Sequence, residues 1–285
     1  MNSADMVEAA ERLGLGFAPA LADLVRPSLV LDLTNSTDIC LPLGSRLGGQ
    51  PALPDSDSWP RKGGKPLACV AQINLAEVAT VHIFSELPKS GLLIFFYDAD
   101  AQPWGFDPAD KGSFAVRYVP NPIGCSSVSD WPKDLGESLR FTDNAVTFRR
   151  IITLPSAGSA EITKLNLDTE QFEAYEQLLS EISDDLNQGS RSLLLGNPDQ
   201  IQLGDMFDYL PLVTAGINTG CKLPDDARTR ELREHAKEWR LLLQVESLET
   251  SNMIWGSMGL LYFCITAEAL RARDFDAAWL ALQCT

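Results

Sequence analysis

The sequence is poor in histidine and in basic charge, and each shortage excludes a class of function. It holds only two histidines, His82 and His235, so a Ser-His-Asp or Cys-His catalytic arrangement would have to use one of them. Lys and Arg number 23 against 39 Asp and Glu, which leaves a net charge of −16. Such a chain repels phosphate backbones, so nucleic acid is not an expected partner.

Long apolar runs and paired cysteines are also missing. The longest runs, GLLIFFY and MGLLYFCI, have less than half of the roughly 18 residues that a membrane-spanning helix needs. The N-terminal segment MNSADMVEAAERLG lacks a signal-peptide pattern, so we expect a cytoplasmic protein without membrane contact. The six cysteines form no CxxC pair, and neither an HExxH motif nor a calcium loop occurs. The sequence therefore predicts no disulfide framework, no metal site and no cofactor.

The apolar patterns predict an α+β fold with a sheet-rich core. Continuous or alternating apolar runs indicate strands at 28–33, 39–43, 66–73, 91–98, 113–119, 241–247 and 259–266. Residues 138–155 read as two strands joined by a turn at Asp143-Asn144. Helices are predicted within 4–26, from an Asp168 cap to about 186, at about 225–237 and from Thr266 to 272.

Three sequence elements recur in the same order and predict an internal duplication. CVAQINL (69–75) resembles LLLQVES (241–247), and LGGQP (47–51) has a counterpart in LGNP (195–198). GLLIFFYD (91–98) and GLLYFCIT (259–266) are identical at four of eight positions. We therefore expect a helical N-terminal extension over 1–27, and a single domain over 28–285 made of two related β-rich halves, about 28–165 and 166–285.

Several unusual motifs together resemble one known family. They are LGGQPALP, PLACVAQINL, LPKSGLLIFFYD, LLGNPDQIQLGDM, WRLLLQVES and WGSMGLLYFCIT, and the final LRARDFDAAWLALQC fits the same pattern. Over about residues 28–284 the chain resembles the YwqG-like, or DUF1963, family of uncharacterised bacterial proteins. The resemblance implies an α+β fold with a sheet-rich core and internal duplication. It implies no established activity and supplies no catalytic residues.

The Gly/Pro-rich loop 46–65 is the part of the chain that most resembles a binding site. It carries four cations in an acidic protein, and its glycines let a backbone approach a ligand closely. The alternative is a structural hairpin whose prolines fix an extended path. Trp104 and Trp255, each followed by glycine, are candidates for an aromatic wall. The predicted ligand site, in a cleft between the halves, comprises Arg46, Gly48, Gly49, Trp59, Arg61, Lys62, Lys65, Gln72, Gln244 and Trp255.

These features favour a binding or interaction protein over an enzyme. We expect it to meet a basic protein partner through its acidic surface, as an adaptor or an immunity protein would. The alternative function is an enzyme or sensor that acts on a small anionic ligand in the cleft between the halves. No catalytic residue is predicted in either case.

Overall fold

A computed structural model of the chain describes residues 8, 10–14, 21–34, 41–54, 57–122, 129–187, 189–202, 204–220 and 224–284. Its main element is one sheet of ten strands, in the order β12-β11-β10-β9-β1-β8-β2-β5-β6-β7, with antiparallel neighbours throughout. The strands are β1 (Arg26–Leu33), β2 (Arg46–Leu47), β5 (Ala68–Asn74), β6 (Leu92–Tyr97), β7 (Phe114–Val119), β8 (Asn144–Thr153), β9 (Leu193–Leu194), β10 (Trp239–Glu246), β11 (Leu260–Thr266) and β12 (Trp279–Gln283). The α+β class and the sheet-rich core are confirmed.

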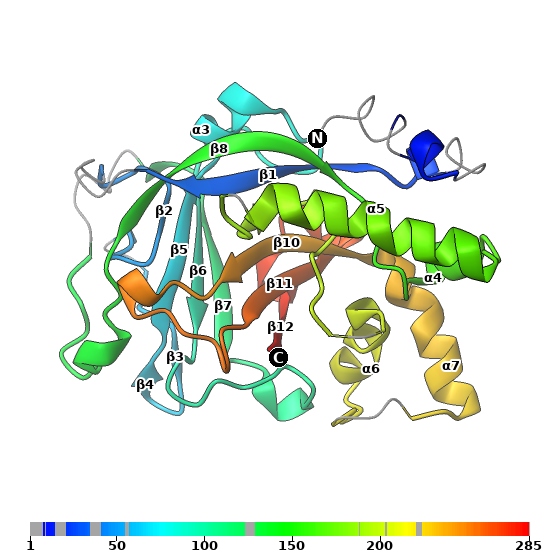
Figure 1. Cartoon of the computed structure of the whole chain (residues 1–285). Helices are drawn as coiled ribbons and strands as arrows, with labels where there is room; N and C mark the ends of the chain where they lie inside the picture. The colour runs from blue at the N-terminus through cyan, green and yellow to red at the C-terminus, as the bar shows by residue number, and fades with distance from the viewer. Residues whose placement is uncertain are drawn as a thin grey trace.

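The sheet curls until its two edge strands come close together (Figure 1). Phe114 of β7 packs edge-on against Trp279 of β12, with ring centroids 5.2 Å apart. Inside the curl, Phe95 of β6 meets Phe263 of β11 at 5.1 Å. Both phenylalanines are fully buried, as are most side chains of the strands that carry them. The curved sheet thus encloses the main apolar core.

Helices pack outside the sheet and at its ends. They are α3 (Leu75–Val81), α4 (Ala160–Thr163), α5 (Thr169–Asn187), α6 (Leu210–Thr214), α7 (Ala227–Arg233) and α8 (Ala267–Ala272). The longest, α5, lies across the molecule in front of β10 in Figure 1. Its predicted capping box is confirmed, because Gln171 N–H donates to the Asp168 carboxylate at 2.9 Å and Asp168 N–H donates to the Gln171 amide at 3.1 Å.

Two strand predictions are wrong over the described residues. Leu41–Gly44 forms a turn, closed by a 2.9 Å hydrogen bond from Gly44 N–H to the Leu41 carbonyl. The predicted hairpin at Asp143-Asn144 has only its second strand, β8. The reason is that the preceding segment contacts the turn after β2 instead, where Gly49 N–H donates to the Phe141 carbonyl at 3.1 Å.

The predicted N-terminal extension falls mainly outside the described residues, so it stays a prediction. Residues 10–12 and 21–22 are helical, and β1 begins at Arg26, in the middle of the sheet. No helix of the described residues is both long and apolar enough to cross a membrane.

Candidate functional site

Arg46 and Gln72 lie side by side on β2 and β5 and bind the loops around them. Gln72 is fully buried; its amide accepts from Ala52 N–H at 2.8 Å and donates to the Pro42 and Gly44 carbonyls, both at 3.0 Å. The guanidinium of Arg46 donates to the carbonyls of Leu41, Pro42 and Gln50 at 2.7–3.0 Å. Both side chains therefore hold backbone carbonyls and amides of this chain.

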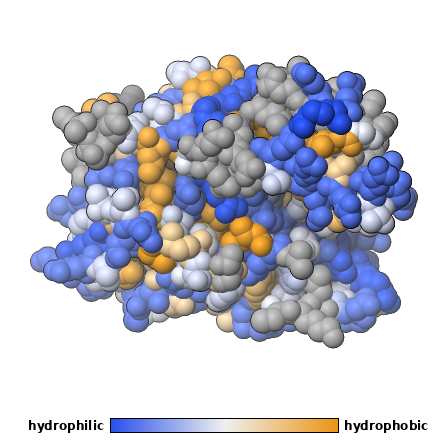
Figure 2. Space-filling view, in the orientation of Figure 1, coloured by the Kyte–Doolittle hydropathy of each residue, from blue (hydrophilic) through white to orange (hydrophobic). Residues whose placement is uncertain are grey.

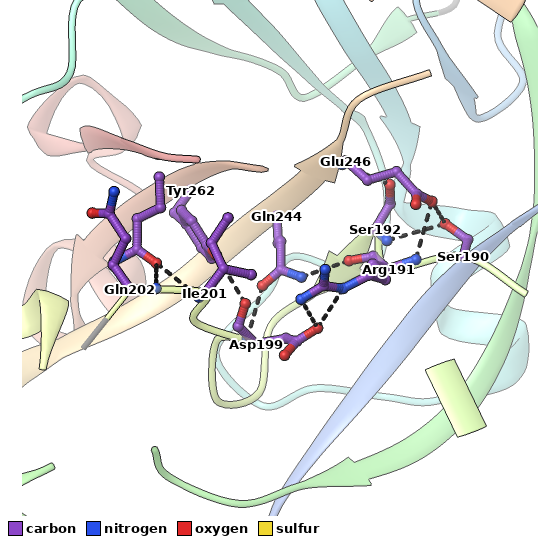
Figure 3. Close-up of polar contacts among 10 residues, drawn as sticks. Ser190, Arg191, Ser192, Asp199, Ile201, Gln202, Gln244, Glu246 and Tyr262 are labelled. Atoms are coloured by element: carbon purple, nitrogen blue, oxygen red, sulfur yellow. Dashed lines mark hydrogen bonds and ion pairs between the residues drawn. The ribbon is translucent and has the colours of Figure 1, made fainter. Parts of the chain in front are cut away.

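Gln244 on β10 belongs to a second polar network (Figure 3). Its amide accepts from Asp199 N–H at 2.9 Å and donates to the Arg191 carbonyl at 2.6 Å. Arg191 also pairs with the Asp199 carboxylate at 2.7 Å, and Tyr262 O–H donates to the Asp199 carbonyl at 2.8 Å. Burial raises the pKa of Glu246, whose carboxylate accepts from Ser190 O–H and Arg191 N–H in the same network.

The two glutamines occupy matching positions. Each directly follows a register irregularity in its strand pair, which lies between Cys69 and Ala71 in one case and between Leu241 and Leu243 in the other. Each accepts from the N–H that directly follows a proline, Pro51 or Pro198, and donates to carbonyls of the segment before its short neighbouring strand.

The turn after each short strand is alike as well. Gly48 and Gly49 both have positive φ, and so do Leu195 and Gly196. A Cβ on Gly48 would lie 2.5 Å from the Thr142 carbonyl oxygen, and one on Gly49 would lie 2.5 Å from the Asp143 Cβ. These glycines are needed for close packing of this turn.

The remaining cations of the loop 46–65 contact carboxylate, carbonyl or hydroxyl oxygens of this chain. Arg61 makes a bidentate ion pair with Asp134 at 2.6 and 2.9 Å, and this hydrogen bonding lowers the pKa of Asp134. Lys62 donates to the Ala109 carbonyl oxygen and to the Ser113 hydroxyl oxygen, each at 2.6 Å. Lys65 pairs with Asp100 at 3.2 Å.

Both predicted tryptophans of the site serve packing in this structure. Trp59 donates its indole N–H to the Leu67 carbonyl at 2.8 Å and packs on Phe96 at 5.5 Å. Trp255 is fully buried between Tyr97 and Phe141, each at 5.7 Å. The ten predicted site residues therefore fall in separate places: the β2–β5 pair, the loop 51–67, and the surroundings of Gln244 and of Trp255. A ligand site built from them stays a prediction.

A cavity of 610 Å³ lies where the loop after β6 meets the segment around α6. We call it the aromatic–acidic cavity. Its lining residues are Ala101, Gln102, Pro103, Trp104, Phe106, Asp107, Asp110, Gln202, Met206, Tyr209, Asn218, Gly220 and Gln283. Residues on both sides of position 166 thus contribute to it, but none of the ten predicted site residues is among these lining residues.

The loop 101–110 is fixed in place by the sheet and by its own carboxylates. The Trp104 carbonyl accepts from Leu282 N–H of β12 at 3.1 Å, and the Gly105 carbonyl accepts from the Trp279 indole N–H at 2.8 Å. Asp110 accepts from Gly105 N–H at 2.9 Å, and Asp107 caps the 3₁₀ turn that follows. The loop is therefore a preformed wall.

The cavity combines aromatic rings, of which Trp104 is exposed, with negative charge. Trp104 is 43% exposed, although it is anchored through its backbone. Phe106 packs on Tyr209 with ring centroids 5.2 Å apart. Asp107 and Asp110 are the charged residues among the described lining residues, and no Lys or Arg is among them.

Sequence reasoning identified Trp104 as a candidate aromatic wall but missed Asp107, Asp110 and Tyr209. The available signal was the local sequence WGFDPAD, in which two aromatic residues precede two carboxylates at a proline turn. The contribution of Tyr209 and Asn218 had no local signal, because they come from a distant segment.

Comparison with known proteins agrees with the sequence motifs. No curated protein matches the chain. Residues 45–284 match the family model described as "Domain of unknown function (DUF1963)", which confirms the resemblance inferred from the motifs. Because this match covers well over half of the 285 residues, the protein is a member of the DUF1963 family.

Proposed function

We propose that the protein is a binding protein for a basic partner, and that the aromatic–acidic cavity receives a lysine or arginine side chain of that partner. The observation that carries the proposal is the pairing of an exposed Trp104 with two carboxylates in one preformed cavity. Aromatic faces attract cations, and a neighbouring carboxylate adds a charged hydrogen bond.

The size and the charges of the cavity fit such an occupant. Its 610 Å³ lies within the roughly 300–1,000 Å³ of small-ligand sites. Asp107 uses its two oxygens for Ala109 N–H at 2.8 Å and Asn218 at 2.6 Å, and a carboxylate oxygen has room for a second donor. The overall charge of −16 speeds the approach of a cationic partner.

The face of the molecule in Figure 2 is largely hydrophilic. On the face in Figure 2, hydrophobic residues form separate small patches between hydrophilic ones. A partner that docks on this face meets mainly polar groups, as is usual for association steered by electrostatics. Adaptor- or immunity-like action on a basic protein is compatible with this arrangement.

The second hypothesis, a small anionic ligand between the halves, fits this cavity less well. Asp107 and Asp110 would repel an anion there. An enzyme or sensor for such a ligand would need a different site on the molecule.

We also propose that the domain arose by an internal duplication and that the protein is cytoplasmic. We take the matching glutamine networks and turns as support for an internal duplication, with β2-β5-β6-β7 and β9-β10-β11-β12 as the related units. For the proposed cytoplasmic location, the support is that the cysteines among the described residues, Cys69, Cys264 and Cys284, are free thiols, as is usual in a reducing compartment.

Calorimetric titration with a Lys-Arg-Lys peptide and with its norleucine-citrulline-norleucine analogue tests the function. Wild type should bind the basic peptide and not the neutral one. The double variant Asp107→Asn, Asp110→Asn should bind about tenfold more weakly or worse, because it loses both charges but keeps side chains that can cap turns.

The matched control removes two exposed carboxylates elsewhere, by Asp23→Asn and Asp225→Asn. Its affinity should stay within about twofold of wild type, since screened distant charges contribute little. If both double variants bind the peptide equally weakly, the loss of affinity is due to overall charge and not to this cavity, which contradicts the proposal. Absence of any binding by wild type would refute the proposal.

A further inference from the structure

A second cavity, of 280 Å³, has the opposite character and lies at another end of the sheet. We call it the arginine cavity. Arg26 at the start of β1 and Arg240 at the start of β10 line it, together with the turn at Leu195-Gly196. The segment His82–Glu86 after α3 and Leu270 of α8 complete the wall.

Arg26 has a partly buried guanidinium without a bonding partner. Within the part of the chain that the structure describes, its side chain makes no hydrogen bond and no ion pair. Burial lowers the pKa of Arg26, although Glu161 and Glu86 oppose this effect from a distance. A guanidinium taken partly out of water without an acceptor is costly for the fold, and a bound anion would offset that cost.

Arg240 adds a second cation to the same cavity. Its Nη1 donates to the carbonyls of Lys237 at 2.6 Å and Trp239 at 2.7 Å, which fixes the side chain and leaves its other N–H groups for further acceptors. Burial and the nearby charge of Arg26 lower the pKa of Arg240. Two like charges are therefore held near each other. The charges of Glu161 and Glu86 raise the pKa of both arginines, but within the described residues neither arginine forms an ion pair with Asp or Glu.

One carboxylate, Glu86, lines the cavity. It is exposed, and it accepts from Ser85 O–H at 2.9 Å rather than pairing with either arginine. His82 stacks edge-on against Phe84 at 4.6 Å, and burial together with the charge of Arg150 lowers the pKa of His82, so its ring is favoured in the neutral form. The cationic character of the cavity thus comes from Arg26 and Arg240.

We infer that the arginine cavity binds a small oxyanion, a phosphate or a carboxylate group, between Arg26 and Arg240. The planar N–H groups of two guanidiniums match the oxygens of such a group. This site is independent of the aromatic–acidic cavity: it shares no lining residue with it and takes ligands of the opposite charge.

The test follows the thermal unfolding midpoint of the full chain as inorganic phosphate or succinate replaces chloride at constant ionic strength. Stabilisation by phosphate alone identifies a phosphate site, and stabilisation by succinate alone identifies a carboxylate site. Wild type should be stabilised by at least one of them, because a ligand that binds only the folded state raises the midpoint. Arg26→Gln and Arg240→Gln should each abolish the shift, whereas Arg271→Gln, an exposed arginine that does not line the cavity, should keep it.

A variant that binds anions more strongly provides a test that misfolding cannot explain. Glu86→Gln removes the opposing carboxylate and should strengthen anion binding several-fold by calorimetry. The inference is refuted if neither anion stabilises wild type more than chloride does. It is equally refuted if Arg26→Gln, shown by circular dichroism to be folded, is stabilised as much as wild type.

Discussion

At the scale of single residues, the most informative side chains are buried polar ones that hold the backbone. Gln72 and Gln244 are both fully buried, and their amides saturate loop N–H and carbonyl groups. Their positions after apolar runs indicated buried amides in need of partners. Which partners they have depends on loops 20 to 53 residues away along the chain, and local sequence does not specify these.

Gln72→Met and Gln244→Met should each lower the free energy of unfolding by about 2–4 kcal/mol. Methionine keeps the volume, but it leaves buried backbone groups without hydrogen bonds, at roughly 1–3 kcal/mol each. Urea unfolding measures the change. Gln177→Met, on the exposed face of α5, is the control and should change stability by less than about 0.5 kcal/mol. If the two buried variants match this control, the networks do not stabilise the fold.

Asp205 should make the protein less stable as the pH rises. Burial raises its pKa from 3.8 to about 6, although its carboxylate accepts from Phe207 N–H. Between these values the folded state binds the proton more tightly than the unfolded chain. The destabilisation is therefore absent below pH 3.8, grows as the pH rises, and is complete above about pH 6.

Asp205→Asn removes this titration while keeping the amide oxygen for the cap. The free energy of unfolding of the variant minus that of wild type should increase by roughly 1 kcal/mol from pH 5 to pH 7. Denaturant unfolding of both proteins at the two pH values gives the difference, in which all other titrating groups cancel. A constant difference across this range would mean that Asp205 is not perturbed as described.

At the scale of elements, the local signals predicted best. The capping box of α5 was read from Asp168 and Gln171, because capping depends on residues three positions apart. The absence of a strand before β8 was not predictable in the same way. It depends on the contact between Gly49 and Phe141, which are distant in sequence.

The proposed function depends on the loop 101–110. This loop packs closely against β12 at Gly105. A Cβ on Gly105 would lie 1.9 Å from the Leu280 carbonyl oxygen, whereas one on Gly112 meets nothing within 4 Å. Their φ angles are alike, +83° and +87°. Gly105→Ala should therefore destabilise the protein by at least about 2 kcal/mol more than Gly112→Ala, whose cost of about 1 kcal/mol comes from φ alone.

The measurement is the urea midpoint of each alanine variant, followed by peptide binding of any that folds. Gly105→Ala should also weaken binding of the basic peptide, because the neighbouring Trp104 is displaced with the loop. Equal stability of the two variants would show that the loop is not tightly seated against β12.

At the scale of the whole molecule, the sequence predicted the fold class and the family. It did not predict how the two proposed halves combine. Strands of the two predicted halves combine into one sheet, with β8 and β1 at its centre. The aromatic–acidic cavity arises from that joining, since Asp107 and Asn218 are 111 residues apart and bond at 2.6 Å. Likewise, the cations of loop 46–65 predicted an anion site, but Arg61 pairs with Asp134, which is 73 residues away along the chain and could not be identified as its partner from local sequence.

The most direct test of the proposed function is ¹⁹F NMR of the chain with its six tryptophans replaced by fluorotryptophan. Trp104 is assigned by the signal lost in Trp104→Phe. On titration with the Lys-Arg-Lys peptide, the Trp104 resonance should shift saturably, while the buried Trp255 resonance stays in place. Asp107→Asn with Asp110→Asn should abolish the shift. A Trp104 resonance that does not move while the peptide binds, or that moves equally in the double variant, would contradict recognition of a cation in this cavity.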